Sequence, residues 1–160
     1  MDETLHPDLE ALAPLLGTWV GDGGGGYPTI EDFGYREEIT FAHVGKPRLD
    51  YHQSTVLAAS GLRAHGEMGY LRPAGPGRVE MVIAHPTGHT EVAEGELLTQ
   101  PDGLSIHLLS TTVTRTATAK DVSAIERRIT VTGDVLRYQL AMAAVGQPLQ
   151  HHLAAELRRA

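Results

Sequence analysis

Imidazole is the side chain most available for chemistry in this sequence, which holds nine histidines and no cysteine among its 160 residues. The lack of thiols excludes disulfides, thiolate catalysis, iron–sulfur clusters and zinc sites with cysteine ligands. Imidazole remains as a ligand for a metal ion or a cofactor iron, and as an acid or base. Three groups of histidines have spacings that suit such chemistry.

The first group is the segment His85-Pro-Thr-Gly-His89-Thr-Glu91, in which two imidazoles and a carboxylate bracket a turn. These residue types could bind a metal ion. No helix or rigid strand pair is evident to hold them in ligand geometry, so we favour the alternative of a polar hairpin tip.

The second group is His65 and Glu67, which are separated by one residue in an expected strand. Their side chains therefore share one face of the strand. The two could act as an acid–base pair, but we favour a hydrogen-bonded pair with a structural role.

The third group is the adjacent pair His151 and His152, in the last expected strand. Neighbouring strand residues point to opposite faces, so only one of the two can face an interior. Alternation groups His151 with Leu149 and Leu153, and His152 with Gln150. Patterning alone therefore predicts that His151 points inward. A β-bulge after Gln147-Pro148, or a strand whose apolar face packs on the N-terminal helix, would reconcile an inward His152 with this pattern.

A glycine-rich segment over residues 17–30 contains six glycines and the only tryptophan. Four of the glycines fall at even spacing, on one face of an extended strand: Gly17, Gly21, Gly23 and Gly25. A face without side chains lets a flat, bulky group approach the backbone. No lysine follows and no helix begins here, so a phosphate-binding loop is disfavoured. The alternative is a flexible glycine-rich loop.

The elements that must position these groups are mainly strands. Turn sequences such as Pro101-Asp-Gly103 and Gly133-Asp134 separate about ten alternating runs at intervals of roughly 8–12 residues. Before them, a short helix over about residues 7–16 is predicted, because Leu5, Leu9, Leu12 and Leu16 recur at helical spacing. The sequence thus predicts one all-β domain over residues 1–160, an antiparallel barrel of about ten strands with a short N-terminal helix. Such a barrel can enclose one sizeable ligand.

Net charge and the lengths of the apolar runs limit the kinds of partner that we expect this chain to bind. The net charge is −7, and the basic pairs Arg127–Arg128 and Arg158–Arg159 are expected on solvated faces, so we predict no nucleic-acid binding. No run of 18 apolar residues occurs, so we predict no membrane span. The acidic start over residues 1–4 lacks the apolar core of a secretory signal, and we expect a cytoplasmic protein.

Several motifs along the chain resemble those of one known family. They are Leu5-His-Pro-Asp-Leu-x-x-Leu12, Gly17-Thr-Trp-Val-Gly-Asp-Gly23, Tyr27-Pro-Thr-Ile30, His43-Val-Gly-Lys-Pro47, Gly69-Tyr-Leu-Arg72 and Gln147-Pro-Leu-x-x-His-Leu153. Together they resemble the nitrobindins, haem-binding ten-stranded barrels that are calycin-like and distantly similar to fatty-acid-binding proteins. The resemblance spans about residues 5–158.

The resemblance implies one haem b per subunit, which binds nitric oxide and isomerises peroxynitrite to nitrate. It places the axial iron ligand on His152, with His151 as the rival from patterning. The other cofactor contacts that it implies are Thr29, Lys120 and His65. A strand face without side chains would give the flat cofactor room, so we also expect contacts at Gly17, Trp19, Gly21 and Gly23.

Two other functions suit the same barrel. One is a non-catalytic carrier of a fatty acid or other apolar ligand, which would need the cavity but no iron ligand. The other is a haem-based sensor of nitric oxide, which needs the same open coordination position as an enzyme. A homodimer is possible through the outer wall of the barrel.

Overall fold

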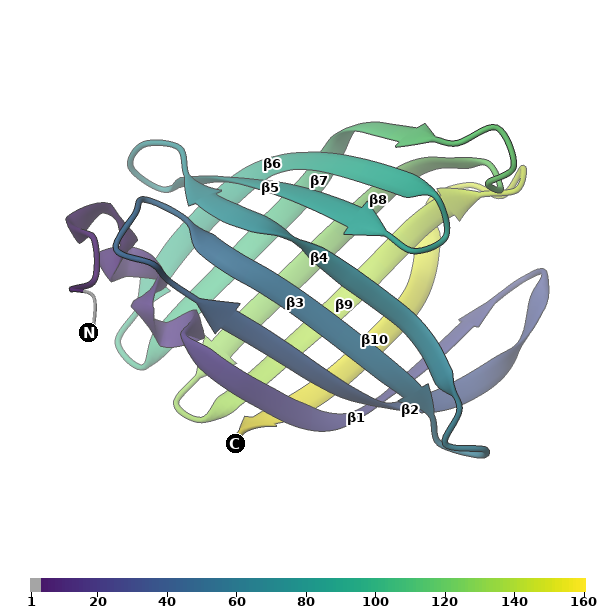
Figure 1. Cartoon of the computed structure of the whole chain (residues 1–160), viewed down its shortest axis with the longest axis horizontal. Coiled ribbons are helices and arrows are strands. Elements are labelled where there is room, and N and C mark those ends of the chain that lie inside the picture. Colours follow the sequence, from purple (N-terminus) through teal and green to yellow (C-terminus); the bar gives the residue numbers. More distant parts are fainter. Residues whose placement is uncertain (1–3) are drawn as a thin grey trace.

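The computed structural model describes residues 4–160, so Met1–Glu3, part of the segment behind the secretory-signal expectation, lie outside the described residues. Ten antiparallel strands form a closed barrel, in which each strand pairs with the next and the last pairs with the first (Figure 1). The strands are β1 (Gly17–Tyr27), β2 (Ile30–Ala42), β3 (Leu49–Leu57), β4 (Arg63–Pro73), β5 (Arg78–His85), β6 (His89–Gln100), β7 (Gly103–Arg115), β8 (Val122–Thr132), β9 (Val135–Ala144) and β10 (Gln150–Arg159). The predicted ten-stranded antiparallel barrel is confirmed.

A short helix, η1 (Pro7–Leu15), precedes β1 and lies at one end of the barrel (Figure 1). It is a 3-10 helix whose buried residues are Leu9, Leu12 and Leu15. That three-residue repeat is the period of a 3-10 helix, and Leu16 is the C-cap. The predicted helix is confirmed, with a tighter winding than the α-helical spacing suggested. No helix of the described residues has the length and apolar character of a membrane span.

Trp19 fixes η1 to the barrel. Its side chain is fully buried, and its indole N–H donates to the carbonyl oxygen of Leu15 over 2.8 Å. The guanidinium of Arg159 lies 4.2 Å from the centre of the indole ring and donates to the carbonyl oxygen of Pro14. The large apolar core extends from this end of the barrel into its middle, and its members include Leu9, Leu12, Phe41, Leu49, Leu71, Leu104 and Leu157.

The other end of the barrel is formed by the β1–β2, β3–β4, β5–β6, β7–β8 and β9–β10 connections. In Figure 1 these connections lie toward the right, away from η1. The residues that line a large cavity come from four of these connections, all but β3–β4, and from the adjoining strand ends. The strand order therefore gives the barrel one closed apolar end and one end with a ligand-sized cavity.

The glycines of β1 accommodate side chains of the neighbouring strands. A Cβ at Gly23 would overlap the ring of Tyr35 in β2, and a Cβ at Gly25 would overlap Leu153 and Phe33. Tyr35 is buried, and its hydroxyl lies 2.6 Å from that of Tyr138. The bare face of this strand thus provides room for residues of this chain.

We predict that Gly23→Ala destabilises the fold whereas Gly24→Ala does not. The added methyl group at position 23 would displace the buried Tyr35 ring, which costs about 1–3 kcal/mol for an overpacked site. At Gly24, which lies on the opposite face, the nearest atom is the Phe33 carbonyl oxygen at 3.8 Å. Urea unfolding of both variants measures the difference, and equal stability of the two would contradict this account of the glycine face.

Candidate functional site

A cavity of about 710 Å³ opens at the end of the barrel opposite η1. This volume lies within the roughly 300–1,000 Å³ of small-molecule and cofactor sites. Apolar side chains such as Phe33, Leu57 and Met142 form much of its wall, and histidines are set among them. The cavity is therefore the candidate site.

His152 reaches the cavity through a β-bulge. The pairing of β10 with β9 shifts register between His151 and Leu153, so alternation breaks at His152. His152 and Leu153 both line the cavity, whereas His151 is exposed and is not part of the lining. The inward orientation of His151 that strict alternation predicted is therefore wrong, because the bulge resets the faces of the strand.

The imidazole of His152 is held as a neutral ring. Its Nδ1 lies 2.9 Å from the carbonyl oxygen of Gly26, so Nδ1 carries the proton and donates it to that oxygen. Burial lowers the pKa of His152 and outweighs the effect of this hydrogen bond. The rings of Tyr27 and Phe33 lie 5.4 and 6.5 Å from it, in edge-on contact. Nε2 consequently carries a lone pair suited to a metal.

Three other predicted contacts also line the cavity. Thr29 lies in the β1–β2 turn, Lys120 in the β7–β8 connection and His65 in β4. The backbone oxygen of Lys120 is 2.7 Å from Nε2 of His89, which holds this connection against the β5–β6 turn. The remaining four, namely Gly17, Trp19, Gly21 and Gly23, are not in the lining.

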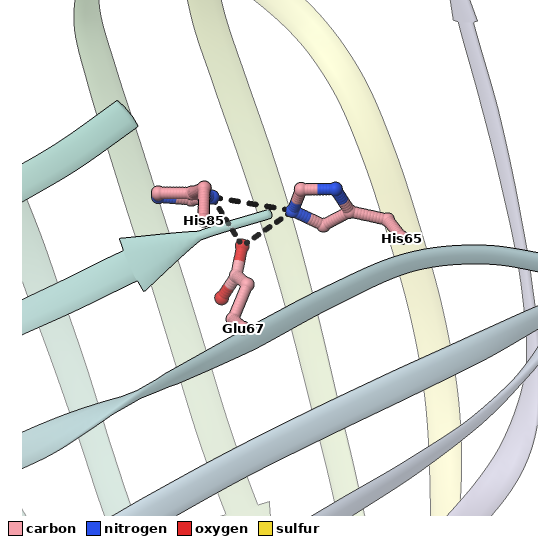
Figure 2. Close-up of side chains that lie close together, drawn as sticks. All are labelled: His65, Glu67 and His85. Carbon is pink, nitrogen blue, oxygen red and sulfur yellow. Dashed lines mark hydrogen bonds and ion pairs between the residues drawn. The ribbon is translucent and has the colours of Figure 1, made fainter. Parts of the chain in front are cut away.

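His65, Glu67 and His85 point toward one another at the base of the cavity (Figure 2). Nε2 of His65 is 3.2 Å from Nδ1 of His85, and the other ring nitrogen of His85 is 3.1 Å from a carboxylate oxygen of Glu91. The same-face placement of His65 and Glu67 is confirmed, with 3.5 Å between Nε2 and Oε1. The predicted hairpin over residues 85–91 is confirmed as well, but His85 and Glu91 point into the barrel rather than forming a polar tip.

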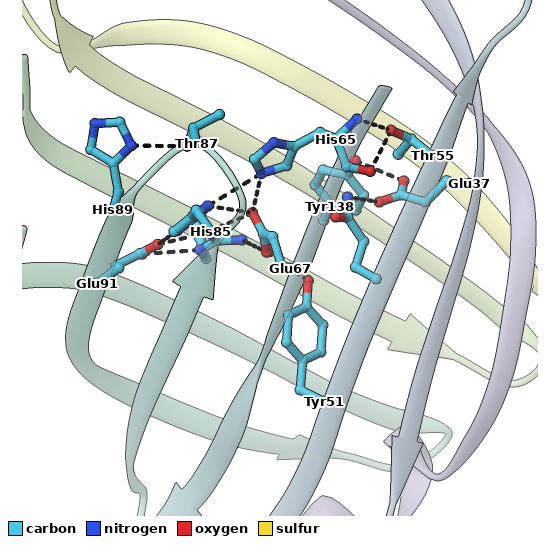
Figure 3. Close-up of polar contacts among 12 residues, drawn as sticks. Glu37, Tyr51, Thr55, His65, Glu67, His85, Thr87, His89, Glu91 and Tyr138 are labelled. Carbon is cyan, nitrogen blue, oxygen red and sulfur yellow. Dashed lines mark hydrogen bonds and ion pairs between the residues drawn. The ribbon is translucent and has the colours of Figure 1, made fainter. Parts of the chain in front are cut away.

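Arg127 lies between two buried carboxylates, those of Glu67 and Glu91. Figure 3 labels these two carboxylates. The Arg127 guanidinium donates two hydrogen bonds of 3.0 Å to Glu67, and bonds of 3.1 and 2.8 Å to Glu91. Burial is the largest single effect and would raise the pKa of both carboxyls. Arg127 and the neighbouring histidines together outweigh it, so the pKa of Glu91 is lowered and that of Glu67 falls well below its usual range. The cluster holds two negative charges and one positive charge out of water.

Glu37 forms a second buried carboxyl site nearby (Figure 3). It accepts hydrogen bonds from Gln53 Nε2 over 2.6 Å and from the hydroxyl of Tyr138 over 2.7 Å. Burial raises the pKa of Glu37 to about 7, although both hydrogen bonds act in the opposite direction. Unlike Glu67 and Glu91, Glu37 has no bidentate cation, which is why burial prevails.

Sequence reasoning missed Arg127, which was expected on a solvated face beside Arg128. The signal was present in the alternation of β8, where Ile125, Arg127, Ile129 and Val131 share the buried face. A charged residue on a buried face needs a partner. Its partners could not be identified from the sequence, because Glu91 and Glu67 are 36 and 60 residues away.

Comparison with protein-family models matches residues 8–159 to the THAP4-like, heme-binding beta-barrel domain. The match covers every strand and all of the helix except its first residue.

Curated relatives agree with that match. Peroxynitrite isomerase 2 of Mycobacterium ulcerans (strain Agy99) is 53% identical over 159 residues, which cover 99% of each chain. Peroxynitrite isomerase of Nocardia farcinica (strain IFM 10152) is 54% identical over 155 residues, or 97% of this chain and 92% of the relative. The crystal structure of Rv2717c from M. tuberculosis superposes with a TM-score of 0.95 at 50% identity, covering 98% of this chain and 99% of that one.

We predict that Arg127→Met lowers the free energy of unfolding by roughly 3–5 kcal/mol, because it leaves two buried carboxylates without their cation. The matched control is Arg128→Met, in the next residue of the same strand. Arg128 is exposed and pairs with Glu126, so its loss should cost less than about 1 kcal/mol. Chemical denaturation of both variants measures this, and a similar cost for both would argue against a structural role for the buried cluster.

We also predict a pH dependence of stability that arises from Glu37. Because the folded state raises this pKa from 4.5 to about 7, the folded state binds the proton more tightly than the unfolded chain. The stabilisation is complete below about pH 4.5 and is lost as the pH rises through about 7.

The control is Glu37→Gln, which cannot titrate and can still hydrogen-bond to Gln53 and Tyr138. Relative to wild type, its free energy of unfolding should increase by up to about 3 kcal/mol between acidic and mildly alkaline pH. Denaturation at about pH 5 and about pH 8 measures the change. A constant difference between the two proteins would exclude Glu37 as the titrating group.

Proposed function

The chain belongs to the nitrobindin family of THAP4-like haem-binding β-barrels, and we propose that it is a haem-dependent enzyme that isomerises peroxynitrite to nitrate. One observation carries the site assignment. The β-bulge at His152 directs a neutral imidazole, with its Nδ1 already committed to Gly26, into a cavity of cofactor size. We assign His152 as the residue that would bind the iron of one haem b.

The residues of the cavity fit this cofactor. Apolar walls suit the macrocycle, and a neutral imidazole suits the iron. Thr29 and Lys120 lie in the connections at the mouth, and His65 lies on a separate wall. Lys120 is exposed, so an ion pair with a haem carboxylate would contribute at most about 1 kcal/mol.

Bound ferric haem supplies a Lewis-acidic iron and a one-electron partner for the oxidant. The protein contributes a single imidazole ligand, held in one orientation by the carbonyl oxygen of Gly26. It also supplies an enclosure of apolar side chains around the reacting molecule. Nitric oxide binding at the same open position is part of the proposal.

The carrier alternative is weakened by the charges at the base of the cavity. A fatty-acid carboxylate buried in a barrel needs a cation, and Arg127 is already paired with Glu67 and Glu91. A sensor of nitric oxide would use the same haem site, so it remains the second candidate function. A cytoplasmic location, consistent with a sequence free of cysteine, and a homodimer stay proposals from the sequence.

We predict that His152→Ala weakens the binding of ferric haem, whereas His151→Ala retains it. A titration of purified protein with ferric haem, followed by the Soret band, gives the stoichiometry and affinity. Wild type should bind one equivalent, and His152→Ala should bind at least about 10-fold more weakly, with a band characteristic of unligated haem. His151 is exposed, so its loss should leave the titration unchanged.

The loaded proteins are then mixed with peroxynitrite, and nitrate and nitrite are quantified. Nitrate should dominate with wild type and with His151→Ala. Haem binding with nitrite as the main product would support the sensor or a different chemistry. Full haem affinity in His152→Ala would overturn the ligand assignment.

A further inference from the structure

A second group of ligand atoms lies in the cavity, on strands that do not carry His152. Nε2 of His65, Nδ1 of His85 and Oε1 of Glu67 form a compact triangle, visible in Figure 2 as the three dashed lines. Its sides measure 3.2 Å between the two nitrogens, 3.5 Å from His65 to Glu67 and 3.6 Å from His85 to Glu67. The ligand atoms come from the adjacent strands β4 and β5.

Two of these three distances suit a shared metal ion better than hydrogen bonds, while the 3.2 Å contact between the two rings is also a hydrogen bond. Contacts of 3.5 and 3.6 Å between a ring nitrogen and a carboxylate oxygen are too long for good hydrogen bonds. Zinc binds imidazole nitrogen and carboxylate oxygen at about 2.0–2.2 Å, and tetrahedral angles then place its ligand atoms roughly 3.3–3.6 Å apart. The triangle therefore has the dimensions of three corners of a tetrahedral site.

Hydrogen bonds with neighbouring side chains leave lone pairs on these ligand atoms free to bind a metal ion. Nε2 of His85 lies 3.1 Å from Oε2 of Glu91, so the proton sits on Nε2 and the lone pair of Nδ1 faces the triangle. A carboxylate behind a ligating histidine is the usual second partner in metal sites, because it fixes the tautomer and strengthens the ligand. Glu67 is ionised because Arg127 donates to both of its oxygens, and the hydroxyl of Tyr51 donates to Oε2.

We propose that His65, Glu67 and His85 bind one divalent transition-metal ion of the zinc class, separate from the haem iron. Two imidazoles and one carboxylate select zinc, cobalt or ferrous iron over magnesium and calcium, which prefer oxygen ligands. Three protein ligands leave a fourth position for water or a small anion, as in catalytic rather than structural zinc sites.

The ion can reach this site through the cavity. His65 lines the cavity and keeps a third of its side chain exposed, whereas the side chains of Glu67 and His85 are buried. His65 and His85 come from β4 and β5, and His152 comes from β10. Binding of the ion by the haem-free protein therefore does not rest on the proposed function.

The experiment is a titration of the full-length protein with Zn²⁺ by calorimetry and with Co²⁺ by visible absorption, before and after loading with haem. Haem-free wild type should bind one equivalent of Zn²⁺, and Co²⁺ should give the intense bands of a four-coordinate ion. Calorimetry with Mg²⁺ should show no binding. His65→Ala should weaken Zn²⁺ binding at least about 10-fold, because it removes a ligand on the cavity side of the cluster.

His107→Ala is the matched control, since His107 is an exposed histidine 2.7 Å from Glu126 and is the obvious adventitious surface site. It should leave the titration unchanged. Thermal unfolding of each variant shows whether it is folded. Glu91→Gln gives an independent readout, because loss of the carboxylate behind His85 should lower the affinity for Zn²⁺ by about 10–100-fold. Binding that is absent in wild type, unchanged in folded His65→Ala, or lost in His107→Ala would overturn the proposal.

Discussion

The pairing of Arg127 with Glu67 and Glu91 is the interaction on which the interior of the barrel depends. The guanidinium comes from β8 and the carboxylates from β4 and β6, so the hydrogen bonds cross the inside of the barrel. Each of these charges would cost several kcal/mol to bury alone. Because the three charges neutralise one another in part, they can form a buried polar layer between the apolar core near η1 and the cavity at the other end. His65 and His85 therefore contact side chains that cannot repack freely.

The fold was largely predictable because its information is local. Turn sequences such as Pro101-Asp-Gly103 and Gly133-Asp134 connect β6 to β7 and β8 to β9, and each hairpin follows from its own residues. Positions that depend on non-local pairing were not predictable in this way. The bulge that turns His152 inward is a property of the register between β10 and β9. The inward orientation of Arg127 depends on carboxylates that no sequence pattern connects to it.

In the glycine-rich strand, the spacing of the glycines correctly predicted a bare face but did not show what occupies the space beside it. Even spacing predicted a face without side chains, and the structure has that face, but Tyr35, Phe33 and Leu153 fill the space. Alternation cannot tell whether a bare face receives a ligand or a neighbouring strand's side chains. Here the glycines act indirectly, because they allow Tyr35 to reach Tyr138, whose hydroxyl donates to Glu37. They shape one wall of the cavity without lining it.

Each of two imidazoles in the cavity is held in one tautomer by a hydrogen bond from one ring nitrogen, but the acceptors of the two bonds differ. His152 commits Nδ1 to the neutral carbonyl of Gly26, whereas His85 commits Nε2 to the carboxylate of Glu91. A carboxylate partner makes an imidazole a stronger electron donor than a carbonyl partner does. His85 is thereby suited to a hydrated divalent ion that must be stripped of water. The carbonyl-bound His152 donates less charge, so an iron bound there would keep more of its Lewis acidity for an anionic oxidant. The hydrogen-bond partner behind each ring thus gives the two imidazoles different donor strengths.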